Sequence, residues 1–437
     1  MTDLNLRINP ITFWSMYDQS SRGRYGSQQR GAKAAPSTDR EARALFHAKH
    51  KIAGASTRSS TSPRGLQSEM NSTRRIILVQ TQAENAGAQE ISRLVGAGLT
   101  ALGYEVYNLF FFRKSESFDE PPNTFYCSSS RPGNPMALLS FLWQLGRHIR
   151  KIRPDAVLTF QHFGNVIGGG VSRLVSTAPV IANQVSSGMS MSWPVRSADI
   201  VMGSLGVFKY ITVNSLDMQR EYARYPASYR SRMKHVAHGF DDKSLDISKE
   251  AARQLFNLPL DAVLLGCAAR LHPHKRLDAA IRLLPGEPSW HLALAGQGPD
   301  EGRLRLLADE LKVSGRVHFI GEISPQRMGE FLACLDVFVF PSQAETFGLA
   351  AVEAANAGIP SVVTDLPVLR EVLSFEGKPA ALFVDASDNA KLSAAVSRIL
   401  ADKTLSDRLR RNAKGLKSRY SVGTMVDEYV GILNQAI

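Results

Sequence analysis

The sequence predicts an α/β protein built from two doubly wound domains that face each other across a cleft. Its strand-like segments are apolar throughout, as in "RRIILVQ" (74–80), which is typical of parallel sheets covered by helices on both faces. These segments alternate with helical ones, and the alternation starts again near residue 250. The chain of 437 residues also exceeds one ordinary domain. Because such sheets bind ligands at the carboxyl ends of their strands, we expect a ligand site between the two domains.

The first predicted domain covers residues 71–250. A loop of small residues opens its first helix, residues 85–104, and a second helix follows at 137–152. The glycines of "VIGGGVSR" (166–173) are not followed by the Lys-Ser/Thr of a nucleotide P-loop, so we expect a flexible turn or a close helix contact there. The expected strands are residues 74–80, 105–112, 155–160, 179–184 and 209–215.

The second predicted domain covers residues 251–437. One of its helices, residues 349–358, is rich in Ala and Leu and is stopped by Gly358 and Pro360. The closing helix, residues 424–437, could pack on either domain. The expected strands are residues 262–271, 291–298, 317–322, 336–342, 359–365 and 381–386.

Composition limits the classes of protein that fit. The fractions of apolar residues, 44%, and charged residues, 21%, are those of a globular protein, and no apolar run reaches the roughly 18 residues of a membrane span. Three scattered cysteines argue for a reducing compartment and against a disulfide framework or a zinc site. We therefore expect a cytoplasmic protein. Its net charge of +12 favours anionic partners.

Residues 1–70 differ from the rest of the chain. They are rich in Ser, Arg, Gly and Gln and show no sustained apolar period, which predicts a disordered basic leader. A basic anchoring arm is the alternative. We expect a chain that starts at Met70 to fold and to keep its activity.

Two glutamates stand eight positions apart in "PSQAETFGLAAVEAANAGIPSVV" (341–363). Glu345 falls in the turn between a strand and a helix, and Glu353 falls inside that helix. The first N–H groups of the helix lack helical partners and can bind an anion. At about 1.5 Å of rise per residue the two carboxylates would stand about 10 Å apart across that anion site. A nucleotide sugar, with a sugar on one side of its diphosphate and a ribose on the other, has similar dimensions.

Residues 341–365 resemble the Glu-x7-Glu signature of the retaining glycosyltransferases of family 4, which have the GT-B fold with two Rossmann-like domains. "GCAARLHPHKRLD" (266–278) is similar to the Arg-then-Lys loop of that family, and "LAGQGP" (294–299) to its Gly-rich turn. The resemblance covers nearly all of the second half. It is weaker in the first half, where "NAGAQEIS" (85–92) replaces a Gly-Gly loop and "HGFD" (238–241) replaces Asn-Gly-Val-Asp.

The resemblance implies roles for individual residues. Arg270 and Lys275 would bind the donor's diphosphate and stabilise the departing nucleotide. Glu345 would hold hydroxyls of the transferred sugar, and Glu353 the hydroxyls of the ribose. Gly87 would let its loop approach donor or acceptor, with a packing role as the alternative, and His162 would contact a sugar, with a structural role as the alternative. The diphosphate and sugar pocket would be lined by the backbone of Thr346, Phe347, Gly348 and Leu349.

The function that follows is transfer of a hexose from a nucleotide-sugar donor to a saccharide or lipid-linked saccharide acceptor, in bacterial surface polysaccharide or lipopolysaccharide synthesis. The resemblance implies no cofactor, and because the sequence has no Asp-x-Asp motif we expect no metal. A GT-B-like nucleotide-sugar epimerase is one alternative, and a basic nucleic-acid-binding protein is another. We expect no nucleic-acid partner, because the basic leader has few aromatic residues after Tyr25. The first strand is not followed by G-x-G-x-x-G, which argues against a nicotinamide-dependent dehydrogenase.

Peripheral contact with an anionic membrane is a further hypothesis. It rests on the helix at 137–152, where basic residues gather at the C-terminal end and Phe141 and Trp143 lie nearby. The alternative is an ordinary core-facing helix whose positive end complements its dipole. The face predicted to be apolar consists of Leu138, Leu139, Leu142, Leu145 and Ile149.

Overall fold

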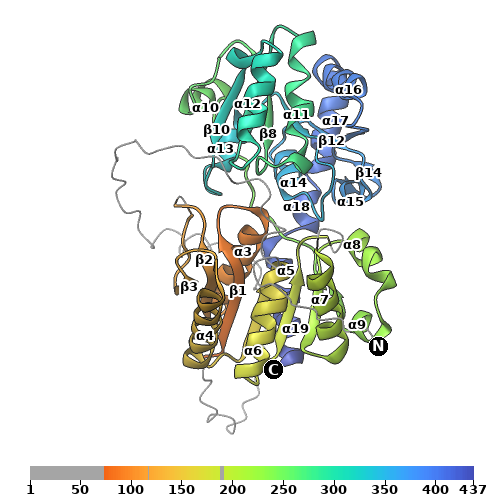
Figure 1. Cartoon of the computed structure of the whole chain (residues 1–437). Coiled ribbons are helices and arrows are strands. Elements are labelled where there is room, and N and C mark those ends of the chain that lie inside the picture. Colours follow the sequence, from red (N-terminus) through yellow and green to blue (C-terminus); the bar gives the residue numbers. More distant parts are fainter. Residues whose placement is uncertain (1–72, 117, 188–190) are drawn as a thin grey trace, which may run out of the picture. The chain divides into compact units, whose positions relative to one another are not determined.

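The computed structural model of the chain describes residues 73–116, 118–187 and 191–437 (Figure 1). The predicted leader, and with it the proposed start at Met70, lies outside the described residues. Everything below concerns the part of the chain from residue 73 onward.

The first sheet is parallel and doubly wound. Its seven strands lie in the order β3-β2-β1-β4-β5-β6-β7, and β1 pairs with both β2 and β4. The chain leaves β1 toward one edge of the sheet and returns beside β1 at β4, so the two halves diverge between these strands. The strands are β1 (Arg75–Ala83), β2 (Glu105–Arg113), β3 (Thr124–Ser128), β4 (Ala156–Phe160), β5 (Val180–Gln184), β6 (Phe208–Val213) and β7 (Met233–His235).

Helices cover both faces of this sheet (Figure 1). One face packs on α3 (Gly87–Ala101), where Ile91, Val95 and Leu99 are fully buried. The other packs on α4 (Pro135–Ile152), with Phe141, Leu145 and Ile149 in the core. Strands buried from both sides need apolar residues at every position, which explains the continuous apolar runs of the sequence. The shorter helices are α5 (Gln161–Phe163), α6 (Gly169–Val175), α7 (Trp193–Leu205), α8 (Leu216–Glu221) and α9 (Ala227–Arg230), and a π-helical turn spans Gly164–Gly168.

The second sheet repeats the architecture. Its six strands lie in the order β10-β9-β8-β11-β12-β15, and β8 pairs in parallel with both β9 and β11. The strands are β8 (Val263–Ala268), β9 (Trp290–Ala295), β10 (Val317–Gly321), β11 (Val337–Phe340), β12 (Ser361–Thr364) and β15 (Leu382–Val384), with a small hairpin of β13 (Ser374–Phe375) and β14 (Lys378–Pro379). The prediction of two doubly wound parallel sheets is therefore confirmed.

The helices of the second half pack on this sheet and, at the end of the chain, on the first. They are α10 (Lys249–Leu255), α11 (Leu277–Ile281), α12 (Glu301–Glu310), α13 (Met328–Ala333), α14 (Leu349–Asn356), α15 (Pro367–Val372), α16 (Asn389–Ala401), α17 (Lys403–Ala413), α18 (Leu416–Arg419) and α19 (Val422–Ala436). The last helix, α19, packs against α3, and its Met425, Tyr429 and Leu433 are buried in the core beneath the first sheet.

Several local expectations need correction. The glycines at 168–170 form no flexible turn: they are helical, and a Cβ on Gly168 would stand 2.7 Å from Cγ1 of Val79, so the alternative of a close helix contact is right. Leu139, expected on the core-facing side of α4, is 61% exposed. Strands β3 and β7 were not expected, because both lie at sheet edges and β3 is half-buried rather than apolar throughout.

Candidate active site

The divergence point of the second sheet carries the first group of candidate residues. Arg270 follows the end of β8, and Lys275 ends a 3₁₀ turn that spans Pro273–Lys275. Glu345 lies in the turn that follows β11, which neighbours β8 on the side opposite β9. Lys275 donates a hydrogen bond of 2.6 Å from Nζ to Oε1 of Glu345. The two loops that leave this point of the sheet are therefore joined by a charge-assisted hydrogen bond.

Burial sharpens the electrostatics of this group. The side chains of Lys275 and Glu345 are only 17% and 10% exposed, so their attraction is little screened by water. Burial, and then the charge of Lys275, lowers the pKa of neighbouring His274 to about 4. The pKa of His272 is lowered as well, by burial and then by Arg270. Both imidazoles are neutral at neutral pH, and Arg270, Lys275 and Arg276 carry the positive charge of this loop.

Glu84, which we did not predict, lies against Arg270. It follows β1, and its Oε1 stands 3.7 Å from Nη1 of Arg270, while its Oε2 stands 2.8 Å from Nζ of Lys114. The Glu84 side chain is 9% exposed. Its place directly after the first strand, where carboxyl ends of a parallel sheet gather, was the signal in the sequence that could have identified it.

Packing constrains the turn before α14. Gly348 has φ +82°, and a Cβ there would stand 2.5 Å from Cδ2 of Leu369, so only glycine fits. Phe347 is buried, and Leu349, the first residue of α14, is half-buried, so at Phe347 only the backbone can face a ligand. Thr346 donates from Oγ1 to the carbonyl of Val185 at 3.1 Å, and its own carbonyl accepts from Ser215 Oγ at 2.9 Å.

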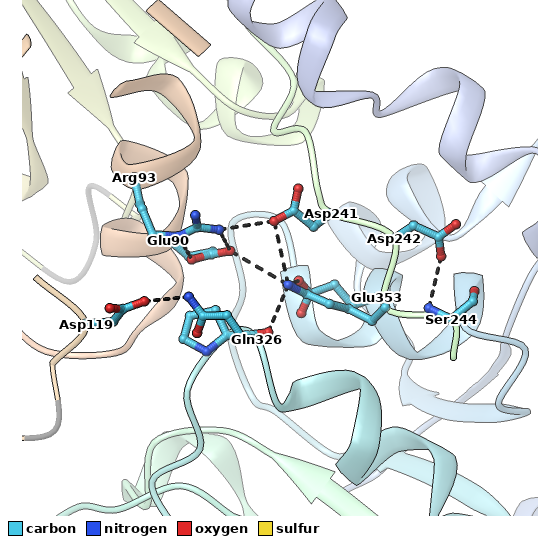
Figure 2. Close-up of polar contacts among 10 residues, drawn as sticks. Glu90, Arg93, Asp119, Asp241, Asp242, Ser244, Gln326 and Glu353 are labelled. Atoms are coloured by element: carbon cyan, nitrogen blue, oxygen red, sulfur yellow. Dashed lines mark hydrogen bonds and ion pairs between the residues drawn. The ribbon is translucent and has the colours of Figure 1, made fainter. Parts of the chain in front are cut away.

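Glu353 lies inside α14 and is buried in a cluster of charges. Nζ of Lys243 stands 3.9 Å from its Oε1, and Figure 2 shows Glu90, Arg93 and Asp241 around it. Burial raises the pKa of Glu353 to about 8, against the opposing effect of Lys243. Glu353 is therefore not a solvated surface residue, and sequence reasoning missed the whole set of its charged neighbours.

The carboxyl ends of the first sheet gather polar groups. His162 follows β4 in α5, and burial lowers its pKa to about 4. Gly87, the first residue of α3, is exposed, and no atom lies within 4 Å of a Cβ placed on it, so the packing alternative has no neighbour to act on. Buried oxygens without a hydrogen-bond partner among the described residues occur here at Gln80 Oε1, Thr81 Oγ1 and Asn214 Oδ1. Buried polar atoms are usually paired, so oxygens without a partner call for a functional explanation.

The described residues contain neither a metal-binding cluster nor a membrane-spanning helix. No group of three or more His, Cys, Asp or Glu side chains in residues 73–116, 118–187 and 191–437 is arranged to hold a metal ion. Within the same ranges, no helix combines the length and apolarity that crossing a bilayer requires.

Two doubly wound sheets, each with candidate ligand-binding residues at its point of divergence, define the GT-B class of proteins. Residues 248–416, which include most of the second α/β unit, match the family model of the glycosyl transferases group 1. Among solved structures, the chain is similar to Anabaena Alr3699/HepE, described in complex with UDP and glucose. That likeness has a TM-score of 0.70 at 17% identity and covers 83% of this chain and 100% of the other, which establishes the fold.

Relatives with more similar sequences match less than half of this chain. The O-antigen biosynthesis glycosyltransferase WclY of Escherichia coli is 32% identical over 162 residues, covering 36% of this chain and 45% of WclY. The lipopolysaccharide core biosynthesis glycosyltransferase LpsD of Rhizobium meliloti is 30% identical over 187 residues, covering 43% of this chain and 53% of LpsD. The chain thus spans about half the length of these relatives.

Proposed function

We propose that the protein is a retaining glycosyltransferase of family 4 that moves a sugar from a nucleotide-sugar donor to a saccharide or lipid-linked saccharide acceptor. The observation that carries the proposal is the pairing of Lys275 with Glu345 beside Arg270, at the divergence point of the second sheet and within the residues that match the group 1 family model. WclY and LpsD, by their names, act in O-antigen and lipopolysaccharide core biosynthesis. Synthesis of a bacterial surface polysaccharide, in the cytoplasm, is the matching role for this chain.

The chemistry follows from where charge develops. The bond from the anomeric carbon to the diphosphate breaks with its electron pair on the phosphate oxygen, so negative charge grows on the departing nucleotide. Arg270 and Lys275 supply fixed positive charge at that place. In the structure these cations pair with Glu84 and Glu345. The donor's diphosphate can replace these carboxylates as the partner of the cations, and its sugar hydroxyls can donate hydrogen bonds to the carboxylate oxygens. Glu345 then binds the transferred sugar next to the lysine that binds its phosphate.

The acceptor belongs at the first sheet. The unpartnered oxygens of Gln80, Thr81 and Asn214 accept hydrogen bonds, which suits the hydroxyls of a saccharide. His162 is neutral at neutral pH and can donate through one ring nitrogen while accepting through the other. These groups support a hydroxyl-rich acceptor over a nucleic acid, whose phosphates would need cations.

Incubation with radiolabelled nucleotide sugars, with and without a membrane extract, tests the proposal. Transfer of label to an acceptor supports it, and the anomeric configuration of the product decides whether transfer is retaining. Conversion of the nucleotide sugar without an acceptor would point to an epimerase instead. Absence of both reactions with all donors would contradict the proposal. We expect a chelator to leave turnover unchanged, since the sequence offers no Asp-x-Asp to hold a metal.

Contact with an anionic membrane is a second part of the proposal and rests on α4. The helix buries Phe141, Leu145 and Ile149, yet its opposite side exposes Met136 at 75%, Leu139 at 61% and Trp143 at 59%. These three positions are spaced by three and four residues and share one helix face. The guanidinium of Arg147 lies 5.3 Å from the Trp143 ring centre and extends that face with a cation.

An exposed apolar stripe that continues into basic residues suits the surface of an anionic bilayer. Sedimentation with anionic and neutral vesicles tests the contact. We expect binding to anionic vesicles alone, and loss of binding when Met136, Leu139 and Trp143 are changed to Ser. Leu306→Ser, an exposed leucine of α12, is the matched control. Equal binding to both vesicle types, or to neither, removes the contact.

A further inference from the structure

Lys243 is a buried cation surrounded by three carboxylates. It lies between β7 and α10, and its side chain is 8% exposed. Its Nζ stands 3.9 Å from Oε1 of Glu90, 3.8 Å from Oδ2 of Asp241 and 3.9 Å from Oε1 of Glu353. The ammonium therefore connects α3 with α14, two helices that belong to different sheets.

Its hydrogen bonding shows that the cluster is not arranged for tight ion pairing. Lys243 donates to the carbonyl of Pro325 at 3.1 Å, whereas all three carboxylate distances exceed the length of a hydrogen bond. Arg93 takes the closer contacts, with two hydrogen bonds of 2.8 Å to Glu90 and one of 3.1 Å to Asp241 (Figure 2). A buried ammonium with loose partners adds little to stability, because its desolvation offsets the attraction. A functional role accounts for it better.

The charges that act on Glu353 come from outside its own helix. Lys243 and Arg93 favour its carboxylate form, and Glu90 and Asp241 oppose it. Helix α14 has no other charged side chain. Helices α17 and α18 pack against α14, and three of their basic side chains interact with residues other than Glu353. Arg410 binds Asp407 and Gly358, Lys417 binds Asp242, and Arg419 binds the backbone of Glu371 and Ser374. Of the described basic side chains, Lys243 alone forms an ion pair with Glu353.

We propose that Lys243 is a positioning residue for the nucleotide's ribose: it favours the carboxylate form of Glu353 and links that side chain to Glu90 on the first sheet's helix α3. The inference rests on the proposed function and on the role that the resemblance to family 4 implies for Glu353, which is to hold the ribose hydroxyls of the donor. A carboxylate accepts hydrogen bonds from two hydroxyls at once. A protonated carboxyl is a weaker acceptor, and its own O–H needs a hydrogen-bond acceptor as well. Removing Lys243 leaves Glu353 buried beside two other acids, so the proton returns and the hydroxyl pair is held less tightly.

The test compares ribose with 2′-deoxyribose. Calorimetry measures the binding of UDP, GDP and ADP, and of their 2′-deoxy counterparts, between pH 6.5 and 9. The affinity for the ribose nucleotide divided by the affinity for its 2′-deoxy counterpart isolates the contact to the 2′-hydroxyl. The titration of the phosphates is common to both ligands and cancels in this ratio. For the wild-type protein we expect this ratio to rise with pH, as Glu353, with its pKa of about 8, loses its proton.

Two variants should move this ratio in opposite directions. Lys243→Met should lower it by about tenfold near pH 8, the scale of a hydrogen bond to a charged group, and leave binding of the 2′-deoxy nucleotide unchanged. Glu90→Gln removes an acid that raises the pKa of Glu353, so the rise in the ratio should move to lower pH. Lys243→Arg should restore much of the wild-type ratio. Lys417→Met, which removes a lysine paired with Asp242, should change nothing.

A purely structural Lys243 would give a different pattern. Equal weakening of the ribose and 2′-deoxyribose ligands in Lys243→Met, or an unchanged ratio, would overturn the inference while the proposed function stands. If Lys243→Met does not fold, Glu90→Gln and Lys243→Arg decide, and an unmoved pH profile in Glu90→Gln would overturn it. Failure of the wild-type protein to bind any of the three nucleotides would overturn the proposed function and this inference together.

Discussion

Lys275 and Glu345 are joined by a hydrogen bond of 2.6 Å between Nζ and Oε1, across two loops that leave neighbouring strands of the second sheet. The backbone reinforces this junction, because the N–H of Gln343 donates to the carbonyl of His274 at 2.8 Å. The proposed contacts to the diphosphate and to the sugar are thus fixed relative to each other before any donor binds. Such preorganisation lets fixed charges act on a transition state without further rearrangement.

Removing either cation of this loop should slow turnover. We expect Arg270→Ala and Lys275→Ala each to lower kcat by about 10² to 10³, equivalent to roughly 3 to 4 kcal/mol of barrier, as for other preorganised charges. Arg305→Ala, which removes an exposed ion pair on α12, should leave kcat unchanged. Steady-state kinetics on folded variants measures the effect. Near-wild-type turnover in both variants would mean that the loop is structural and that the donor site lies elsewhere.

Removing Glu345 and removing Glu353 should change different kinetic constants. Glu353→Ala removes a contact made equally before and during reaction, so we expect a higher KM for the donor with kcat largely preserved. Glu345→Ala disturbs the sugar whose anomeric carbon gains charge, so kcat should fall instead. Initial rates over a range of donor concentrations separate the two effects. The same change of KM and kcat in both variants would contradict the division of roles.

His238 should make the stability of the protein depend on pH. It is buried, and burial, with a smaller effect of His235, lowers its pKa from 6.5 to about 3. The unfolded chain therefore binds a proton that the folded chain rejects, so stability is fully present above pH 6.5 and is lost as pH falls toward 3. His238→Asn removes this titration. Between pH 6 and pH 4.5 the variant should lose about 2 kcal/mol less unfolding free energy than the wild type.

Urea unfolding of both proteins at the two pH values provides the measurement. Asn214 Nδ2 lies 3.5 Å from Nδ1 of His238, so the variant keeps a polar partner. Parallel loss of stability in wild type and variant would show that the buried imidazole does not contribute to acid unfolding.

The fold was predictable because its signal is local. Strands such as β1 and β4, buried on both faces, are apolar at every position, and the alternation with helices defines a doubly wound sheet. The edge strand β3 was not predicted because it is half-buried. Leu139 was assigned to the wrong face because it lies next to the core-facing stripe of α4 without belonging to it. These errors concern surfaces, where the hydrophobic pattern carries little information.

The site was predictable only where one short segment holds it. Glu345 was found from its place in a turn after a strand, whereas Arg270 and Lys275 were found because their loop resembles the Arg-then-Lys loop of family 4. Lys243 was not, because a lysine in a polar loop reads as a surface residue, and only the fold places it between α3 and α14. Glu84 was missed because its partner Arg270 belongs to the other sheet.

Gly87 and Gly348 provide a paired test of why glycine is needed at each position. Gly348 has φ +82° and Leu369 within 2.5 Å of its Cβ position, so Gly348→Ala should cost about 1 to 3 kcal/mol of stability. Gly87 begins a helix with open space around it, so Gly87→Ala should fold with unchanged or slightly higher stability. If its loop must approach a ligand, this variant should still lose activity, because the added methyl group occupies that space. Thermal unfolding and initial rates on both variants test this: a Gly87→Ala protein as stable and as active as the wild type would remove Gly87 from the site.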